Sequence, residues 1–182
     1  TGLPDCPQLK IVRINGSIFF GAVNHLQEAM QAIDAQNPAH VHVLLAASGN
    51  LSVNTDLQIA GNPYTLLRME STAGDLKLNG NLSMGEGTIT LLAEGDVVQG
   101  QGSLIDHHSG SLDIEARTGS FLQGSGAAIQ VAKRGNIERP QGKVRIQAGQ
   151  DIRLDRIDAG AGSIALLADL GSLLEQGDDA AD

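Results

Sequence analysis

Three consecutive side chains that carry metal-binding atoms, Asp106, His107 and His108, form the densest group of potential ligands in the chain. A zinc site needs three or four ligands that converge on one point. Neighbouring residues of a strand point to opposite faces, so these side chains would diverge if the segment were extended. We therefore expect this segment to be a polar loop between structural repeats, with no metal.

The remaining histidines and the single cysteine are also expected to have structural roles. His40 and His42 lie two residues apart, so they share one face of a predicted strand, where packing or an edge position is expected. His25 falls on a predicted helix and is expected to face solvent. One cysteine, Cys6, cannot form an intramolecular disulfide or a multi-cysteine metal site, and we expect it to be partly buried near a strand start.

Carboxylates are frequent in the second part of the chain, at Asp96, Asp106, Asp113, Glu115, Asp151, Asp155 and Asp158. Asp113 and Glu115 have the spacing that puts two acids on one strand face, as cleavage of a glycoside or polyuronate would need, but nothing gives them the different environments that this chemistry requires. Asp151, Asp155 and Asp158 would bind calcium weakly if they gathered at a turn. The simpler interpretation is a solvated acidic face.

Two glycine-rich segments, Gly100-Gln101-Gly102 and Gly124-Ser125-Gly126, lack the rest of a phosphate-binding fingerprint and are predicted to be turns. Ser125 does not fit a nucleophile elbow. The sequence therefore predicts no catalytic, cofactor-binding or metal-binding residue, no cofactor, and a protein that is not an enzyme.

Composition restricts the fold and the partners. The formal net charge is −9 over 182 residues and no basic stretch occurs, which argues against nucleic acid and anionic membranes as partners. No apolar run reaches the 18 residues or so of a membrane-spanning helix, so direct membrane insertion is not expected. Aromatic residues make up 2% of the chain and glycine is abundant, at 23 residues. Such a composition favours thin, repetitive aliphatic layers.

A change in composition near Ser48-Gly49-Asn50 divides the chain into residues 1–48 and 49–182. The first part reads as β-β-α-β, with strands at 8–14, 17–20 and 41–47 and a helix at 22–36. Asn15-Gly16 between the first two strands is a strong hairpin signal.

Residues 6–48 resemble the first half of a STAS domain, the cytoplasmic C-terminal domain of SulP-type anion transporters. The segment Arg-Ile-Asn-Gly-Ser-Ile-Phe-Phe-Gly-Ala, residues 13–22, carries most of this resemblance. The loop and the further helices and strand of that family have no counterpart after Ser48, so no functional residue is carried over. This break leaves open that the two parts form a chimera.

From residue 49 onward, short alternating strands recur, each followed by glycine and a second short strand. The leading apolar residues are 22, 23, 32 and 20 positions apart, and they are Leu67, Ile89, Leu112, Val144 and Ile164. An alanine follows four positions later in four copies, where it would fit a crowded corner: Ala93, Ala116, Ala148 and Ala168. The long interval contains residues 128–135, which we interpret as an extra partial turn. A period of 20–23 residues is typical of a solenoid.

The predicted fold is therefore mainly β, a right-handed β-solenoid of about five to six rungs at residues 49–182 after the small partial STAS-like unit. A sandwich or barrel of separate hairpins is the alternative, but it does not explain the repeated alanine and glycine spacing. The repeats resemble those of filamentous-haemagglutinin-type bacterial surface proteins.

That resemblance implies a structural or adhesive module of a large surface or secreted protein, located at the cell surface or outside the cell. Its partner would be a protein or carbohydrate surface ligand, and end-to-end or edge association is open. The alternative function is a regulatory STAS-type module of an anion transporter at the cytoplasmic face of the inner membrane.

Overall fold

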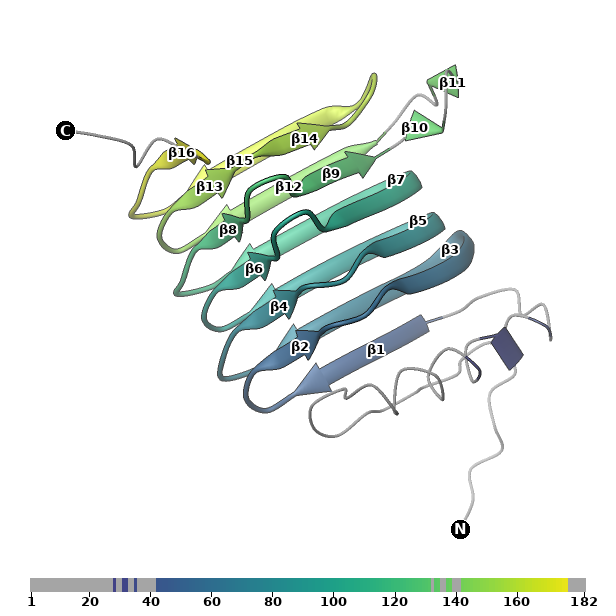
Figure 1. Ribbon diagram of the computed structural model, residues 1–182, viewed down its shortest axis with the longest axis horizontal. Coiled ribbons are helices and arrows are strands. Elements are labelled where there is room, and N and C mark those ends of the chain that lie inside the picture. The colour runs from purple at the N-terminus through teal and green to yellow at the C-terminus, as the bar shows by residue number, and fades with distance from the viewer. Residues whose placement is uncertain are drawn as a thin grey trace, which may run out of the picture.

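The computed structural model describes residues 28, 31–32, 35, 42–131, 133–134, 137–138 and 142–176. Within this part of the chain, parallel strands stack into a β-solenoid of about five turns (Figure 1). The prediction of a mainly β solenoid is confirmed. Strands that are a full turn apart in sequence are neighbours in space, and every pairing along the solenoid is parallel.

The first face of the solenoid is a sheet of long strands in the order β1-β3-β5-β7-β12-β15. Their bounds are β1 His42–Ala47, β3 Leu57–Ser71, β5 Leu82–Ala93, β7 Leu104–Ala116, β12 Lys143–Ala148 and β15 Ser163–Ala168. The N-terminal parts of β3, β5 and β7 continue onto another face, where β9 (Ala128–Val131) and β14 (Arg156–Asp158) complete the row.

The remaining face carries the short strands that follow each corner, in the order β16-β13-β8-β6-β4-β2. These strands are β2 Leu51–Val53, β4 Leu76–Leu78, β6 Val97–Gln99, β8 Phe121–Gln123, β13 Ile152–Leu154 and β16 Leu173–Glu175. Figure 1 shows the two rows running side by side along the length of the molecule. Each turn of the solenoid is thus too thin to fold alone and is stabilised by its neighbours.

The strand register aligns the five leading residues of the predicted repeat in one column. Leu67 pairs with Ile89, Ile89 with Leu112, Leu112 with Val144, and Val144 with Ile164. The predicted alanines form a column of their own, in which Ala93, Ala116 and Ala148 are fully buried. Both predictions are confirmed.

The residues that form the core are set by the alternation of inward and outward side chains along each strand. Leu112 and Ile114 point inward and are buried, whereas Asp113 and Glu115 between them are only partly buried. Inward positions of successive turns are filled by Leu, Ile, Val and Met, so continuous aliphatic columns form. Phe121 is the one aromatic residue in the core of the described part of the chain.

The prediction of an extra partial turn at residues 128–135 is wrong. Strand β9 pairs with the start of β7 and with β14, so it occupies the ordinary third-face position of its turn. The additional length is an antiparallel hairpin of β10 (Lys133–Arg134) and β11 (Ile137–Glu138), which pairs outside the solenoid sheets. An insertion at a corner lengthens the sequence interval without adding a rung.

The solenoid begins earlier than the change in composition suggests. The strand predicted at 41–47 is observed as β1, but it pairs in parallel with β3 as part of the solenoid. Residues 28, 31 and 32 are helical, inside the helix predicted at 22–36. The predicted strands at 8–14 and 17–20, together with Cys6, His25 and His40, lie outside the described residues.

Glycine is required where two turns approach most closely on β5 and β7. Gly87 and Gly110 pair directly and have φ values of 121° and 134°, which side chains rarely adopt. A Cβ atom at Gly110 would lie 1.8 Å from the carbonyl oxygen of Gly87. Only glycine therefore fits at this bend between two faces.

Candidate functional site

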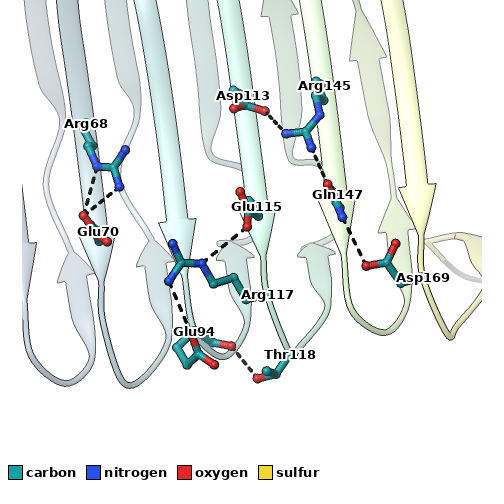
Figure 2. A network of polar contacts seen from close by, with 10 residues as sticks. All are labelled: Arg68, Glu70, Glu94, Asp113, Glu115, Arg117, Thr118, Arg145, Gln147 and Asp169. Atoms are coloured by element: carbon teal, nitrogen blue, oxygen red, sulfur yellow. Dashed lines mark hydrogen bonds and ion pairs between the residues drawn. The ribbon is translucent and has the colours of Figure 1, made fainter.

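The outer surface of the first face carries the acids whose spacing suggested chemistry. Asp113 and Glu115 both project from β7, away from the core, as the alternation predicts (Figure 2). Arg145 Nη1 lies 2.7 Å from Asp113 Oδ1, and Arg117 Nε lies 3.5 Å from Glu115 Oε1. Each acid therefore faces its own guanidinium group, and the two do not form an acid–base pair for glycoside cleavage.

Arg145 on β12 links β7 to its own strand, and Gln147 extends the network to the residue that follows β15. The Arg145 guanidinium also donates to Gln147, whose amide donates to Asp169 Oδ2 at 3.2 Å (Figure 2). The hydrogen bond to Asp113 raises the pKa of Arg145 above its ordinary value, so this side chain is always a cation. Its positive charge pairs with the carboxylate of Asp113 on the neighbouring rung, and it does not release a proton.

A second ion pair group lies nearer the corner. Arg117 contacts Glu94 at 3.7 Å as well as Glu115, and Arg68 pairs with Glu70 at 3.0 Å on β3 (Figure 2). These side chains are partly exposed, and exposed ion pairs stabilise proteins by about 0–1 kcal/mol each. Asp113 and Glu115 are partly exposed on this surface, and each lies beside an arginine, so the face is not simply acidic.

His107 and His108 lie within β7, so the prediction of a polar loop is wrong. His107 points inward and is fully buried in a column between Met84 and Val131, while His108 points outward and pairs with Asp106 at 3.3 Å. The divergence expected for neighbouring strand residues is confirmed. The alternation that begins at the buried Ile105 was the sequence signal for an inward His107.

The His107 ring lies between two backbone carbonyls, and a ring with one N–H donates a hydrogen bond to only one of them. Its Nε2 lies 3.1 Å from the oxygen of Gly87 and its Nδ1 lies 3.4 Å from the oxygen of Met84. Burial lowers the pKa of His107 below its ordinary value, because the charged ring loses its hydration; the two carbonyls oppose this effect. His107 is thus a neutral core side chain and not a metal ligand.

The three acids considered for calcium serve separate turns. Asp151 accepts the backbone N–H of Ser172 at 2.8 Å, Asp155 accepts that of Gly126, and Asp158 accepts that of Gly160 at 2.9 Å. No group of three or more potential metal ligands occurs among the described residues. Gly102 and Gly126 lie in turns with positive φ, so the predicted glycine-rich turns are confirmed.

Sequence reasoning missed a chain of hydrogen bonds at the corner before the short strands. In each turn the side chain of one residue accepts the backbone N–H of its equivalent in the next turn, at 2.8–3.3 Å. We call this the corner ladder, and it consists of Asn50, Asp75, Asp96, Ser120, Asp151 and Ser172. Its signal was the recurrence of Asn, Asp or Ser one residue before each short strand.

A half-open pocket of about 320 Å³ lies beside the first part of β5. It is lined by Gln58, Ile59, Ala60, Gly61, Ser83, Gly85, Glu86 and His108. The His108 imidazole is paired with Asp106 and, within the described residues, makes no hydrogen bond to the Ser83 hydroxyl. The pocket offers hydrogen-bonding groups, but it holds no activated nucleophile.

No helix in the part of the chain that the structure describes has the length and apolarity to cross a bilayer. Comparison of the chain with protein-family models, with curated proteins and with solved structures gives no match.

Proposed function

We propose that this protein is a non-enzymatic structural or adhesive module of a large bacterial surface or secreted protein. The observation that carries the proposal is the unbroken corner ladder, which runs from Asn50 to Ser172 beside the aliphatic columns. Such an arrangement resists bending and local opening, because every turn is bonded to the next through both backbone and side chains.

The chemistry of the surface supports the same role. Several charged side chains of the first face are paired with one another, either between rungs, as Asp113 is with Arg145, or within one strand, as Arg68 is with Glu70. Groups that are already paired on a flat sheet suit a stalk or a contact surface better than a catalytic centre, which needs groups with shifted pKa values in a cleft.

The regulatory module of an anion transporter remains the competing function. It rests on residues 6–48, and the last strand of that resemblance, β1, pairs with the solenoid strand β3. Nothing in the described residues favours this function over the first.

The cellular location of the protein distinguishes the two candidate functions. Antibodies raised against residues 42–176 would be used on the parent cells after treatment of intact cells with proteinase K, with a cytoplasmic enzyme as the control. A surface or secreted module is expected in the medium or in the protease-accessible fraction. Signal that is confined to washed inner membranes and is protected from the protease would overturn the proposal in favour of the transporter module.

A further inference from the structure

The corner between β4 and β5 contains an asparagine followed by a glycine, Asn79-Gly80. Asn79 is exposed and Gly80 is partly buried. An asparagine loses its side-chain amide most readily when glycine follows, because no Cβ atom hinders the approach of the next backbone nitrogen to the side-chain carbonyl carbon. The corner therefore carries a pair of residues that is prone to chemical modification.

The fold itself requires the glycine of this pair. A Cβ atom at Gly80 would lie 2.3 Å from the carbonyl carbon and the oxygen of Thr55 in the preceding turn, and 2.8 Å from the nitrogen of Asp56. The N–H of Asn81 donates to Asp56 Oδ1 at 2.8 Å, which holds the two corners together at this spacing. A residue with a side chain does not fit after Asn79, so the pair is built into the corner.

The modification is deamidation, and its only co-reactant is water. The backbone nitrogen of Gly80 gives up its proton and attacks Cγ of Asn79, so that a new C–N bond forms. The bond from Cγ to Nδ2 breaks, and Nδ2 takes up a proton and leaves as ammonia. Water then opens the resulting succinimide ring at one of its two carbonyl carbons, which gives aspartate or isoaspartate. No atom is oxidised or reduced.

Two hydrogen bonds to the preceding turn oppose this attack in the folded protein. Asn79 Nδ2 donates to Asn54 Oδ1 at 2.7 Å, so the side-chain amide is held by the neighbouring corner. The N–H of Gly80 donates to the Val53 oxygen at 3.3 Å. A nitrogen whose proton is hydrogen-bonded releases that proton less readily, so both reacting groups are restrained.

The chain provides its own controls. Asn54 is exposed at the equivalent corner of the preceding turn, but threonine follows it. Asn50 and Asn81 are followed by leucine, whose side chain hinders the attack, and Asn62 is followed by proline, which has no N–H. Asn15 is also followed by glycine but lies outside the described residues.

We propose that Asn79 is a deamidation site whose reactivity in the folded protein is restrained by Asn54. Loss of the hydrogen bond to Asn54 lets the Asn79 side chain turn toward the Gly80 nitrogen. Formation of isoaspartate inserts one CH₂ group into the main chain between the N–H groups of Asn79 and Gly80, which share the Val53 oxygen as acceptor. The modified corner then no longer matches the preceding turn. This inference does not depend on the proposed scaffold function.

The test incubates the whole chain at mildly alkaline pH, either folded or unfolded in guanidinium chloride. Mass spectrometry of proteolytic fragments assigns each conversion of amide to acid to one asparagine. In the unfolded chain, Asn79 is expected to convert faster than Asn54 and Asn81. In the folded chain, Asn79 should convert about tenfold more slowly than in the unfolded chain, because two hydrogen bonds must break before the attack.

Two substitutions of Asn54 isolate its contribution. Asn54→Ala should accelerate the conversion of Asn79 in the folded protein by about fivefold through loss of the acceptor. Asn54→Asp keeps an acceptor oxygen and should leave the rate close to that of the original protein. Circular dichroism checks that both variants are folded, and the comparison of folded with unfolded original chain needs no variant.

Three results would overturn the proposal. The first is a rate for Asn79 in the unfolded chain that is no higher than that of Asn81. The second is an equal rate for Asn79 in the folded and unfolded chains. The third is a rate that Asn54→Ala leaves unchanged, or that Asn54→Asp raises as much as Asn54→Ala does.

Discussion

The side-chain amide of Gln123 donates a hydrogen bond to the side-chain oxygen of Gln99, 2.9 Å away, and both side chains are buried. The amide of Gln99 in turn donates to the backbone oxygens of Ser103 and Ala128, and the oxygen of Gln123 accepts the N–H groups of Asp155 and Arg156. These two glutamines thus provide hydrogen-bond partners for backbone groups at one corner in three successive turns. The aliphatic side chains of the columns cannot form such bonds.

Replacement of Gln123 by Leu should destabilise the protein despite the similar volume. The change leaves the N–H groups of Asp155 and Arg156 without their acceptor and Gln99 without a donor to its oxygen. We expect a loss of about 2–3 kcal/mol in the free energy of unfolding by urea. Gln101→Leu, at an exposed corner of the neighbouring turn, should change it by less than about 0.5 kcal/mol. Equal losses of unfolding free energy in the two variants would show that the buried hydrogen bonds of Gln123 do not contribute to stability.

The corner ladder predicts different costs for two glycine substitutions. A Cβ atom at Gly119 would lie 2.3 Å from Asp96 Oδ1 and 2.6 Å from the carbonyl carbon of Gly95. Gly119→Ala should therefore lower the free energy of unfolding by about 1–3 kcal/mol. Gly49 precedes the first ladder residue, Asn50, and a Cβ atom there would have no neighbouring atom within 4 Å. Gly49→Ala should be neutral or stabilising by up to about 1 kcal/mol in the same urea titration. A Gly119→Ala protein as stable as the Gly49→Ala protein would contradict the observed packing of the corner.

The sequence was sufficient to predict the columns, because strand alternation is local and the repeat aligns equivalent residues. Leu112 and Val144 were matched across an interval lengthened by the β10–β11 insertion, and the structure pairs them. The pairing of Asp113 with Arg145 follows from that same register. Outward residues could thus be assigned to one surface without coordinates.

Polar residues in the interior were harder to predict, because their partners are backbone atoms of other turns. The ring nitrogens of His107 face the carbonyls of Met84 and Gly87, and the side-chain oxygen of Gln123 accepts the N–H groups of Asp155 and Arg156. The backbone carbonyl or N–H group that a polar side chain contacts depends on the distance between stacked turns. The residue types in the sequence do not determine that distance. The solenoid was therefore predictable as an aliphatic stack, whereas the backbone partners of its interior polar side chains were not.

Buried His107 should make stability depend on pH. Its pKa is lowered in the folded protein by desolvation, so the unfolded chain binds the proton more tightly. The contribution is fully present above the ordinary histidine pKa of about 6.5 and decreases as the pH falls from there toward the folded pKa. Unfolding free energies measured in urea between about pH 7.5 and 5.5 should therefore decrease on acidification. His107→Met, which extends the column from Met84, should flatten this dependence, whereas His108→Gln should retain it. A flat profile in the original protein would contradict the burial of the ring.

The two faces of β12 should respond differently to truncation, although the residues are adjacent. Ile146 is fully buried between Ile114 and Leu166, so Ile146→Ala removes core contacts to both neighbouring turns. The expected loss is about 2–4 kcal/mol in the free energy of unfolding, from lost burial and the cavity that remains. Arg145 is half exposed and bonded to Asp113, and Arg145→Ala should cost less than about 1 kcal/mol, with the difference disappearing in high salt. Chemical denaturation of both variants at low and high sodium chloride measures these changes. If Arg145→Ala were the more damaging change, the solenoid would depend on its surface charges more than on its aliphatic columns.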